Sequence, residues 1–162
     1  MAAPLDRMRG ARSVAVVGAS ARPGSFGERL AIEALRSPGF ARVDLVNPGY
    51  DRVQGIAVAD SLDHLDEPPD LVLFGIPDAQ VPDQLRAAAR LGAGGAVVYG
   101  SAAGLGDELR AAAGDMPVCG AGCMGFLNLT RGCERWATWS ATRCSPAASP
   151  WSRTPGRCSR RC

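Results

Sequence analysis

Short apolar runs recur along the first 130 residues of the chain, and stretches with helical spacing lie between them. The runs are rich in Val, Leu and Ala and occupy residues 13–18, 43–46, 70–76, 95–99 and 117–119. Most end at a glycine or proline or close to one, which is typical of strands buried on both faces of a parallel sheet. The pattern predicts about five strands in one sheet.

Helical signals fill the gaps between these runs. A helix is expected from Ser25, because Glu28 completes a capping-box pattern ahead of an apolar stripe. A second helix is expected over residues 81–91, with Gly92 as its C-terminal cap, and a short third helix near residues 107–113. Alternating strands and helices force crossover connections, so the predicted fold class is α/β with a doubly wound parallel sheet.

Charge and composition divide the chain after residue 131. Its 18 basic residues are all Arg, with 12 of them against 15 acidic residues up to residue 131 and 6 against one acidic residue beyond it. Residues 132–162 hold all three Trp but no Leu, Ile, Val, Met or Phe. Without aliphatic side chains this segment cannot offset its ordering entropy. We expect one domain over residues 1–131 and a disordered tail over residues 132–162.

The overall composition excludes two classes of protein. Hydrophobic residues make up 46% of the chain and charged residues 21%, which argues against a wholly disordered protein. No window holds the ~18 uninterrupted apolar residues of a membrane span, and the first twelve residues lack the apolar core of a secretory signal. A cytoplasmic location is the expectation.

The main chemical feature is the loop GASARPGSFG at residues 18–27, between the first strand and the first helix. Small residues let backbone N–H groups approach a ligand, and the first turn of the helix adds unpaired donors. Arg22 adds a full positive charge. A diphosphate group is the expected ligand, although glycine and serine are also common in strand-to-helix turns that bind nothing.

The spacing of this loop argues against NAD. The dinucleotide fingerprint requires G-x-G-x-x-G directly after the strand and an acidic residue at the end of the second strand. Here the glycines stand at 18, 24 and 27, and the second strand runs into Val46-Asn47-Pro48. Another phosphate-bearing ligand is favoured.

Six separated motifs together resemble the CoA-binding domain of the NDP-forming acyl-CoA synthetases, which include acetate:CoA ligases and the α subunit of succinyl-CoA synthetase. Within residues 12–130 they read VAVVGASARPGSFG, LVNPG, SLDHLDEPPDLVLFGIP, VP, AVVYGSAAG and GAGCMGFLN. The resemblance implies a Rossmann-like domain that binds coenzyme A. It also implies further ligase domains in a full-length enzyme, including an ATP-grasp domain or subunit, and neither nucleic acid nor membrane as a partner.

The resemblance places the candidate binding residues in four loops. The first would cradle the CoA phosphates, the second flank the nucleotide, the third pack against adenine or pantetheine, and the fourth line the thiol channel. They are Gly18, Ser20, Ala21, Arg22, Pro23, Gly24, Ser25, Asn47, Pro48, Tyr50, Ile76, Pro77, Tyr99, Gly100 and Ser101. The family's G-P-N-C-x-G turn appears at residues 120–125 as GAGCMG, with proline and asparagine replaced.

The sequence predicts binding without catalysis. The phosphorylated histidine of this family belongs to a later part of the chain than this sequence reaches. The sole histidine, His64, lies among carboxylates in a polar connection, so we expect it to be exposed, readily protonated and non-catalytic. The six cysteines show no metal-binding spacing, and Cys123 is expected to be a small apolar side chain near the CoA thiol.

The Arg- and Trp-bearing tail has two interpretations. Such a segment can bind nucleic acid through phosphate contacts and stacking. Its composition is also typical of GC-rich coding DNA that is read out of frame. When GC-favoured codons are assigned to the tail and read from the third base of the Cys133 codon, the translation resembles the start of the next domain of the same ligases. We favour a frameshifted remnant. Two other functions stay open for the domain itself, namely part of a protein lysine acetyltransferase or a free-standing CoA or nucleotide sensor.

Overall fold

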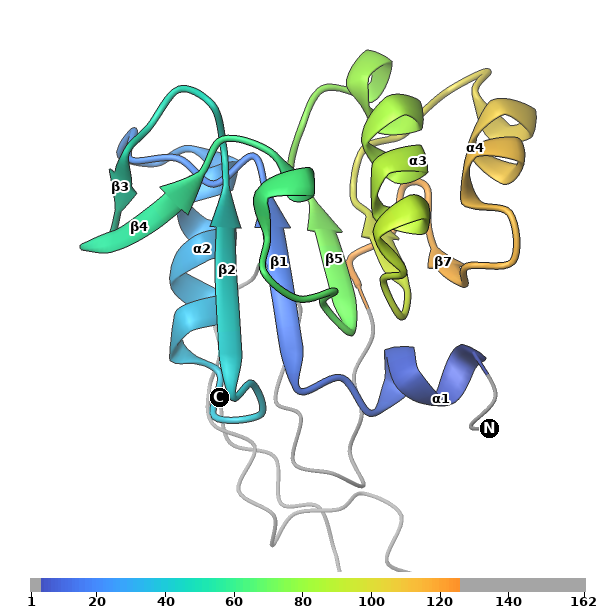
Figure 1. Ribbon diagram of the computed structural model, residues 1–162. Helices are drawn as coiled ribbons and strands as arrows, with labels where there is room; N and C mark the ends of the chain where they lie inside the picture. The colour runs from blue at the N-terminus through green and yellow to red at the C-terminus, as the bar shows by residue number, and fades with distance from the viewer. Residues whose placement is uncertain (1–3, 126–162) are drawn as a thin grey trace, which may run out of the picture.

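A computed structural model describes residues 4–125 of the protein (Figure 1). The expectations for the tail, residues 132–162, lie outside this range. Within residues 4–125, no helix combines the length and the apolar character needed to cross a membrane.

In the described part of the chain, seven strands form one sheet in the order β3-β4-β2-β1-β5-β6-β7. All neighbouring strands are parallel except the β3–β4 pair. The predicted α/β class and parallel sheet are confirmed, and the five expected strands correspond to β1, β2, β5, β6 and β7. The bounds are β1 Ser13–Val17, β2 Arg42–Val46, β3 Arg52–Val53, β4 Ile56–Ala59, β5 Leu71–Phe74, β6 Ala96–Val98 and β7 Val118–Cys119.

Within residues 4–125, α1 precedes the first strand, and three further α-helices and two short 3₁₀ helices connect the strands. The three expected helices are present, and the side chain of Ser25 accepts the Glu28 amide as predicted for an N-cap. Gly92 caps the second expected helix with a φ of 85°. The bounds are α1 Pro4–Arg9, α2 Phe26–Arg36, η1 Leu62–His64, η2 Asp78–Gln80, α3 Val81–Leu91 and α4 Gly106–Ala113.

Alternating side chains of the central strands divide the core into two layers. On β1, Val14 and Val16 belong to the layer under α2, whereas Ala15 and Val17 belong to the layer under α3 and α4. Figure 1 shows α2 on one face of the sheet and α3 with α4 on the other. Because both faces are covered, β1 and β5 are almost wholly apolar.

The prediction of about five strands missed β3 and β4, which form a hairpin in residues that the sequence analysis assigned to no element. β3 has only two residues, and β4 is an apolar run of only four, IAVA, whose first residue Ile56 is 41% exposed, so the signal for these strands is weak. The turn consists of Gln54 and Gly55, both with positive φ, which suits a two-residue hairpin. Pairing of β4 with the edge of β2 and burial of Val53 stabilise the hairpin.

The order of the strands reverses at β1. β2 lies on one side of β1 and β5 on the other, so the chain crosses the sheet between β4 and β5. In an open parallel sheet, ligands bind beyond the carboxyl ends of the strands at such a switch point. The fold therefore directs attention to the loops that follow β1 and β5.

Candidate functional site

Two glycines bring the ends of β1 and β5 into contact with the start of α2. A Cβ on Gly18, whose φ is +92°, would lie 2.5 Å from the carbonyl oxygen of Gly75. A Cβ on Gly27 would lie 2.0 Å from the carbonyl oxygen of Gly18. Only glycine allows such approaches. As a result, α2 begins directly on the two strand ends.

The loop between β1 and α2 is braced by its own side chains. Ser20 Oγ accepts the Arg22 amide at 3.1 Å, and Glu28 Oε2 accepts the Gly24 amide at 2.6 Å. The Ser25 amide bonds to the carbonyl oxygen of Arg22 at 3.2 Å. Three amides of the expected phosphate cradle thus already have acceptors. In the first turn of α2, the amides of Phe26 and Gly27 have no intrahelical acceptor.

The middle of this loop is open to solvent. Ala21, Arg22, Pro23 and Gly24 are all exposed. Gly24 has a φ of +75° and no atom within 4 Å of the place of its missing Cβ. A ligand can therefore approach the Gly24 backbone closely.

The loop after β2 is tied to the loop after β1. Asn47 Nδ2 donates to the carbonyl oxygen of Ala19 at 2.7 Å, and Asn47 Oδ1 accepts the Gly49 amide at 2.9 Å. The hydroxyls of Tyr50 and Ser20 lie 3.2 Å apart. Asn47 and Tyr50 thus position the first loop, and the neighbouring Pro48 is exposed.

Asp78 joins the loops that follow β5 and β6. Its Oδ2 accepts the Ser101 hydroxyl at 3.0 Å and the Ala102 amide at 2.8 Å. Its other oxygen lies so close to Gly100 that a Cβ there would be 2.0 Å away. Sequence reasoning missed Asp78, although its position directly after a strand and a proline was a signal. Ile76 is half-buried against the core, and Pro77 is exposed.

Tyr99 carries the buried polar group that lacks a partner at this edge. Its hydroxyl is inaccessible to solvent and has no hydrogen-bond partner among the described residues. Its ring packs edge-on against Phe26, the first residue of α2, with centroids 5.3 Å apart. Burial, and secondarily the nearby cysteines, raise the pKa of the Tyr99 phenol well above its usual value. Tyr99 is therefore a neutral O–H donor at physiological pH.

The loop after β7, residues 120–125, lies beside the loop after β6. The Gly122 amide donates to the carbonyl oxygen of Gly100 at 2.6 Å, which connects residues 120–125 to the loop after β6. Cys119 and Cys123 are both half-buried free thiols. The structure thus brings together four loops that carry the expected binding residues and adds the loop at residues 120–125 as a neighbour.

His64 has the environment that the sequence predicted. Its side chain is 66% exposed and pairs with Asp60. The hydrogen bond that His64 donates to Asp60, and then the charge of Asp60, raise the pKa of His64 above 6.5. Its exposure and its preference for the protonated form are confirmed. Among residues 4–125, no three His, Cys, Asp or Glu side chains gather as a metal site.

A cavity of about 640 Å³ lies apart from these loops. It is formed where α3 and α4 end, and contains none of the candidate binding residues. Its lining includes Arg7, Gly92, Gly94, Ala112, Asp115 and Pro117.

The family model described as a CoA binding domain matches residues 12–128, and the chain belongs to this family. This match confirms the resemblance found in the sequence motifs. A trans-feruloyl-CoA synthase from an unknown prokaryotic organism is 31% identical over 134 residues, which is 76% of this chain and 19% of that protein. The chain thus spans about a fifth of that curated relative.

Solved structures share the fold in two contexts. The dinucleotide-forming acetyl-coenzyme A synthetase 1 of Ca. Korarchaeum cryptofilum matches with a TM-score of 0.72 and 23% identity, over 82% of this chain and 31% of that one. A conserved hypothetical protein of Pyrococcus furiosus matches with a TM-score of 0.58 and 26% identity, over 66% of this chain and 90% of that one. The fold occurs within long synthetases and as nearly all of a short chain.

Proposed function

We propose that the chain binds coenzyme A where the loops after β1, β2, β5 and β6 meet, as the N-terminal CoA-binding domain of an ADP/NDP-forming acyl-CoA synthetase. In this proposal, residues 1–131 are the binding domain and coenzyme A is the substrate that supplies the acyl-accepting thiol. Phosphoryl transfer and nucleotide binding by an ATP-grasp domain or subunit belong to other parts of the enzyme. The domain alone holds the ligand and forms no thioester.

One observation carries the proposal, which is the contact of the first turn of α2 with the ends of β1 and β5. The approach of Gly27 to the Gly18 carbonyl leaves the amides of Phe26 and Gly27 at the switch point. The partial positive charge of the helix N-terminus lies behind these donors. A diphosphate group satisfies both the amides and the charge.

The loop ahead of the helix refines where the phosphates bind. The Glu28 carboxylate sits on the Gly24 amide, in the place that an anionic ligand would take. We infer that the diphosphate first meets the amides of Phe26 and Gly27 and reaches Gly24 only when Glu28 moves away. The exposed Arg22 supplies a compensating positive charge.

The loops after β5 and β6 suit the remainder of coenzyme A. The pantetheine arm is an extended chain of apolar and amide groups. Ile76 and Pro77 offer it apolar contact, and the unpartnered Tyr99 hydroxyl, which is covered in this structure, becomes a donor for an amide carbonyl when the side chains over it move aside. Asp78 holds Gly100 and Ser101 beside them.

Isothermal titration of the full chain with CoA, dephospho-CoA and NAD tests the ligand. CoA is expected to bind more tightly than NAD, because the second strand ends without the acid that holds the ribose of NAD. Weaker binding of dephospho-CoA would show that the 3′-phosphate is recognised as well. Tighter binding of NAD, or no binding of CoA, would overturn the proposal.

Gly24→Val tests the loop, and Gly55→Val is its matched control. Gly24 and Gly55 have φ values of +75° and +78°, and both have open space around the missing Cβ. Both variants should therefore lose similar stability, about 1–2 kcal/mol from backbone strain. Only Gly24→Val should weaken CoA binding, by about tenfold or more, because its side chain blocks the approach of phosphate. Equal CoA affinity in the two variants would argue against the loop.

A second candidate is a free-standing CoA-binding or nucleotide-sensing protein. The Pyrococcus furiosus protein favours it, because this fold makes up 90% of that chain. Sequencing the gene beyond codon 131 distinguishes the two candidates. ATP-grasp sequence in frame would support the synthetase, and a confirmed stop after this domain would support the free-standing protein.

A further inference from the structure

Two thiols lie against each other at the end of β7. Cys119 Sγ donates to Cys123 Sγ, and the two sulfur atoms are 3.8 Å apart. The Cys123 thiol also lies 3.5 Å from the carbonyl oxygen of Val98 and 3.4 Å from that of Cys119. Both side chains are half-buried, so small oxidants reach them from the adjoining exposed loop.

The residues between the two cysteines allow them to approach further. Gly120 and Gly122 have positive φ values of 117° and 69°, and Ala121 between them is exposed. A disulfide needs the sulfur separation to fall from 3.8 Å to about 2.05 Å. A short movement of an exposed, glycine-rich loop is sufficient for this change.

We propose that Cys119 and Cys123 form a reversible disulfide when the protein meets hydrogen peroxide, with Cys123 as the attacking thiol and Cys119 as the resolving thiol. The Cys123 thiolate attacks one peroxide oxygen, the O–O bond breaks, and Cys123 becomes a sulfenic acid as one water leaves. The Cys119 sulfur then attacks the Cys123 sulfur, and the S–OH bond breaks to release a second water. Two thiols are oxidised and one peroxide is reduced.

The hydrogen bond between the thiols assigns the two roles. Cys119 directs its S–H at the Cys123 sulfur, so the Cys119 proton lies between the two sulfur atoms. Burial, and then the Cys123 neighbour, raise the pKa of the Cys119 thiol. Cys119 therefore keeps its proton while Cys123 reacts, which is the order that the chemistry requires.

The disulfide would also alter the candidate binding site, a consequence that rests on the proposed function. The Gly122 amide bonds to the carbonyl oxygen of Gly100, in the wall expected at the thiol end of CoA. Because Gly122 adjoins Cys123, closing the sulfur pair is expected to disturb this hydrogen bond. Oxidation is expected to weaken CoA binding by about tenfold, the order of one lost hydrogen bond.

Peptide mapping of the full chain tests the disulfide without reference to CoA. Trypsin cuts after Arg110 and Arg131 and releases residues 111–131, which hold Cys119 and Cys123 and none of the other four cysteines. After peroxide treatment and blocking of free thiols, this peptide should lose the mass of two hydrogen atoms and regain it with a reductant. Two blocked thiols, under peroxide that oxidises the other cysteines, would reject the proposal.

Single variants test the roles. Cys119→Ser should accumulate a sulfenic acid at Cys123 that dimedone traps in the same peptide. Cys123→Ser should give little dimedone adduct at Cys119. The reverse pattern, or equal trapping in both variants, would overturn the assignment of attacking and resolving thiols.

Titration with CoA before and after oxidation separates this regulation from the proposed function. The double variant Cys119→Ser with Cys123→Ser is the control, and peroxide should leave its CoA affinity unchanged. A mapped disulfide with unchanged CoA affinity would reject the regulation alone. If the reduced protein does not bind CoA, the proposed function and the regulation both fail, while the peptide map still decides whether the disulfide forms.

Discussion

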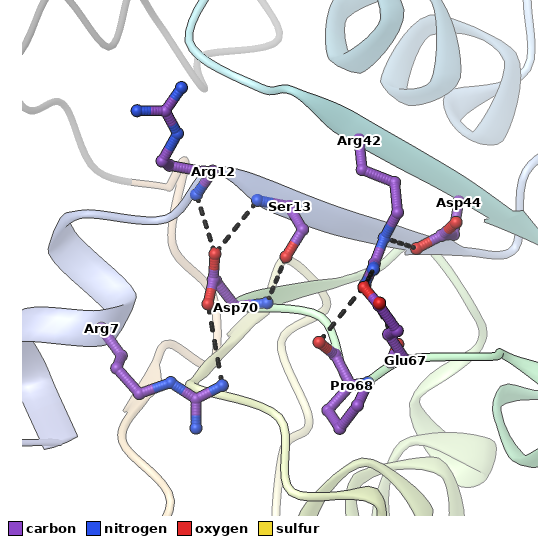
Figure 2. Close-up of polar contacts among 8 residues, drawn as sticks. All are labelled: Arg7, Arg12, Ser13, Arg42, Asp44, Glu67, Pro68 and Asp70. Carbon is purple, nitrogen blue, oxygen red and sulfur yellow. Dashed lines mark hydrogen bonds and ion pairs between the residues drawn. The ribbon is translucent and has the colours of Figure 1, made fainter.

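The two ends of the parallel strands treat their polar groups in opposite ways. At the amino end, Asp70 Oδ2 accepts the amides of Arg12 and Ser13 at 2.9 and 3.2 Å, and Ser13 Oγ accepts the Asp70 amide at 2.9 Å (Figure 2). At the carboxyl end, the Tyr99 hydroxyl has no partner among the described residues. These groups of the first end are bonded to one another, whereas the Tyr99 hydroxyl at the second end is a donor without an acceptor.

Arg42 and Arg7, at the amino ends of the strands, are also paired with acidic side chains of the chain. Arg42 bonds to Asp44 at 3.0 Å, pairs with Glu67 and donates to the carbonyl oxygen of Pro68 at 3.3 Å (Figure 2). Arg7 lies 3.7 Å from Asp70. Such contacts fix the starts of β1, β2 and β5 relative to one another. The comparison indicates that the amino end serves stability, and it agrees with the proposal that the carboxyl end, called the binding end below, holds the ligand.

The largest expected loss of stability comes from placing a side chain where the start of α2 contacts the ends of β1 and β5. Gly27→Ala places a Cβ 2.0 Å from the Gly18 carbonyl oxygen, which neither backbone can avoid without moving α2 off the strand ends. We expect a loss of about 3 kcal/mol or more in unfolding free energy. Chemical denaturation measures it.

Gly106→Ala is the matched control for Gly27→Ala. Gly106 also lies in the first turn of a helix, but no atom lies within 4 Å of its missing Cβ. Alanine there should be neutral or slightly stabilising. Equal stability of the two variants would mean that α2 does not contact β1 as closely as described.

Breaking the amino end should reduce stability and leave binding intact. Asp70→Ala removes the acceptor of two backbone amides, with an expected loss of about 1–2 kcal/mol because the site is partly exposed. Asp70→Asn should lose less, since its side-chain oxygen can still accept both amides. Weaker CoA binding by either variant would contradict the division between the two ends.

The charge of Asp70 also gives this end a pH dependence. Although burial opposes ionisation, the amides of Arg12 and Ser13 lower the pKa of Asp70 below 3.8. The ionised form therefore stabilises the fold above the unfolded-state value, and this contribution is lost as the pH falls through the folded-state pKa. Asp70→Asn should show a smaller loss of stability in acid than the parent protein.

At the binding end, Tyr99→Phe should have the opposite profile to Asp70→Ala. Removing a buried hydroxyl that has no partner should leave stability unchanged or raise it by about 1 kcal/mol. If the hydroxyl donates to CoA, affinity should fall by about tenfold. Denaturation and calorimetry measure the two quantities. A large loss of stability would show that the hydroxyl has a partner within the protein.

Glu28→Gln should strengthen CoA binding, by a smaller factor than Tyr99→Phe weakens it. The carboxylate occupies the Gly24 amide and repels an incoming phosphate, so its neutral isostere should bind CoA about two- to threefold more tightly at low salt. Glu33→Gln removes the same charge from an exposed position further along α2 and should have less effect. Equal gains in the two variants would indicate general charge rather than competition at Gly24.

How much the sequence predicted differs between local and distant contacts. The bounds of α3 followed from Pro82 and Gly92, and the loop after β1 followed from its glycines, because these signals depend on neighbouring residues. The hairpin β3–β4 depends on pairing with β2, which no local pattern encodes. The bond from Ser101 to Asp78 spans 23 residues, so composition and spacing could locate both loops but not the link between them.

The smallest expected effect concerns His64, which lies in neither group of loops. It is the only histidine of the chain, so NMR titration follows one imidazole without assignment. Its pKa should lie above 6.5 and fall towards that value in Asp60→Asn, because Asp60 is the main cause of the increase. The pair stabilises the fold below the unfolded-state pKa, and this contribution is lost as the pH rises through the folded-state value. An unchanged pKa in Asp60→Asn would remove Asp60 as the cause.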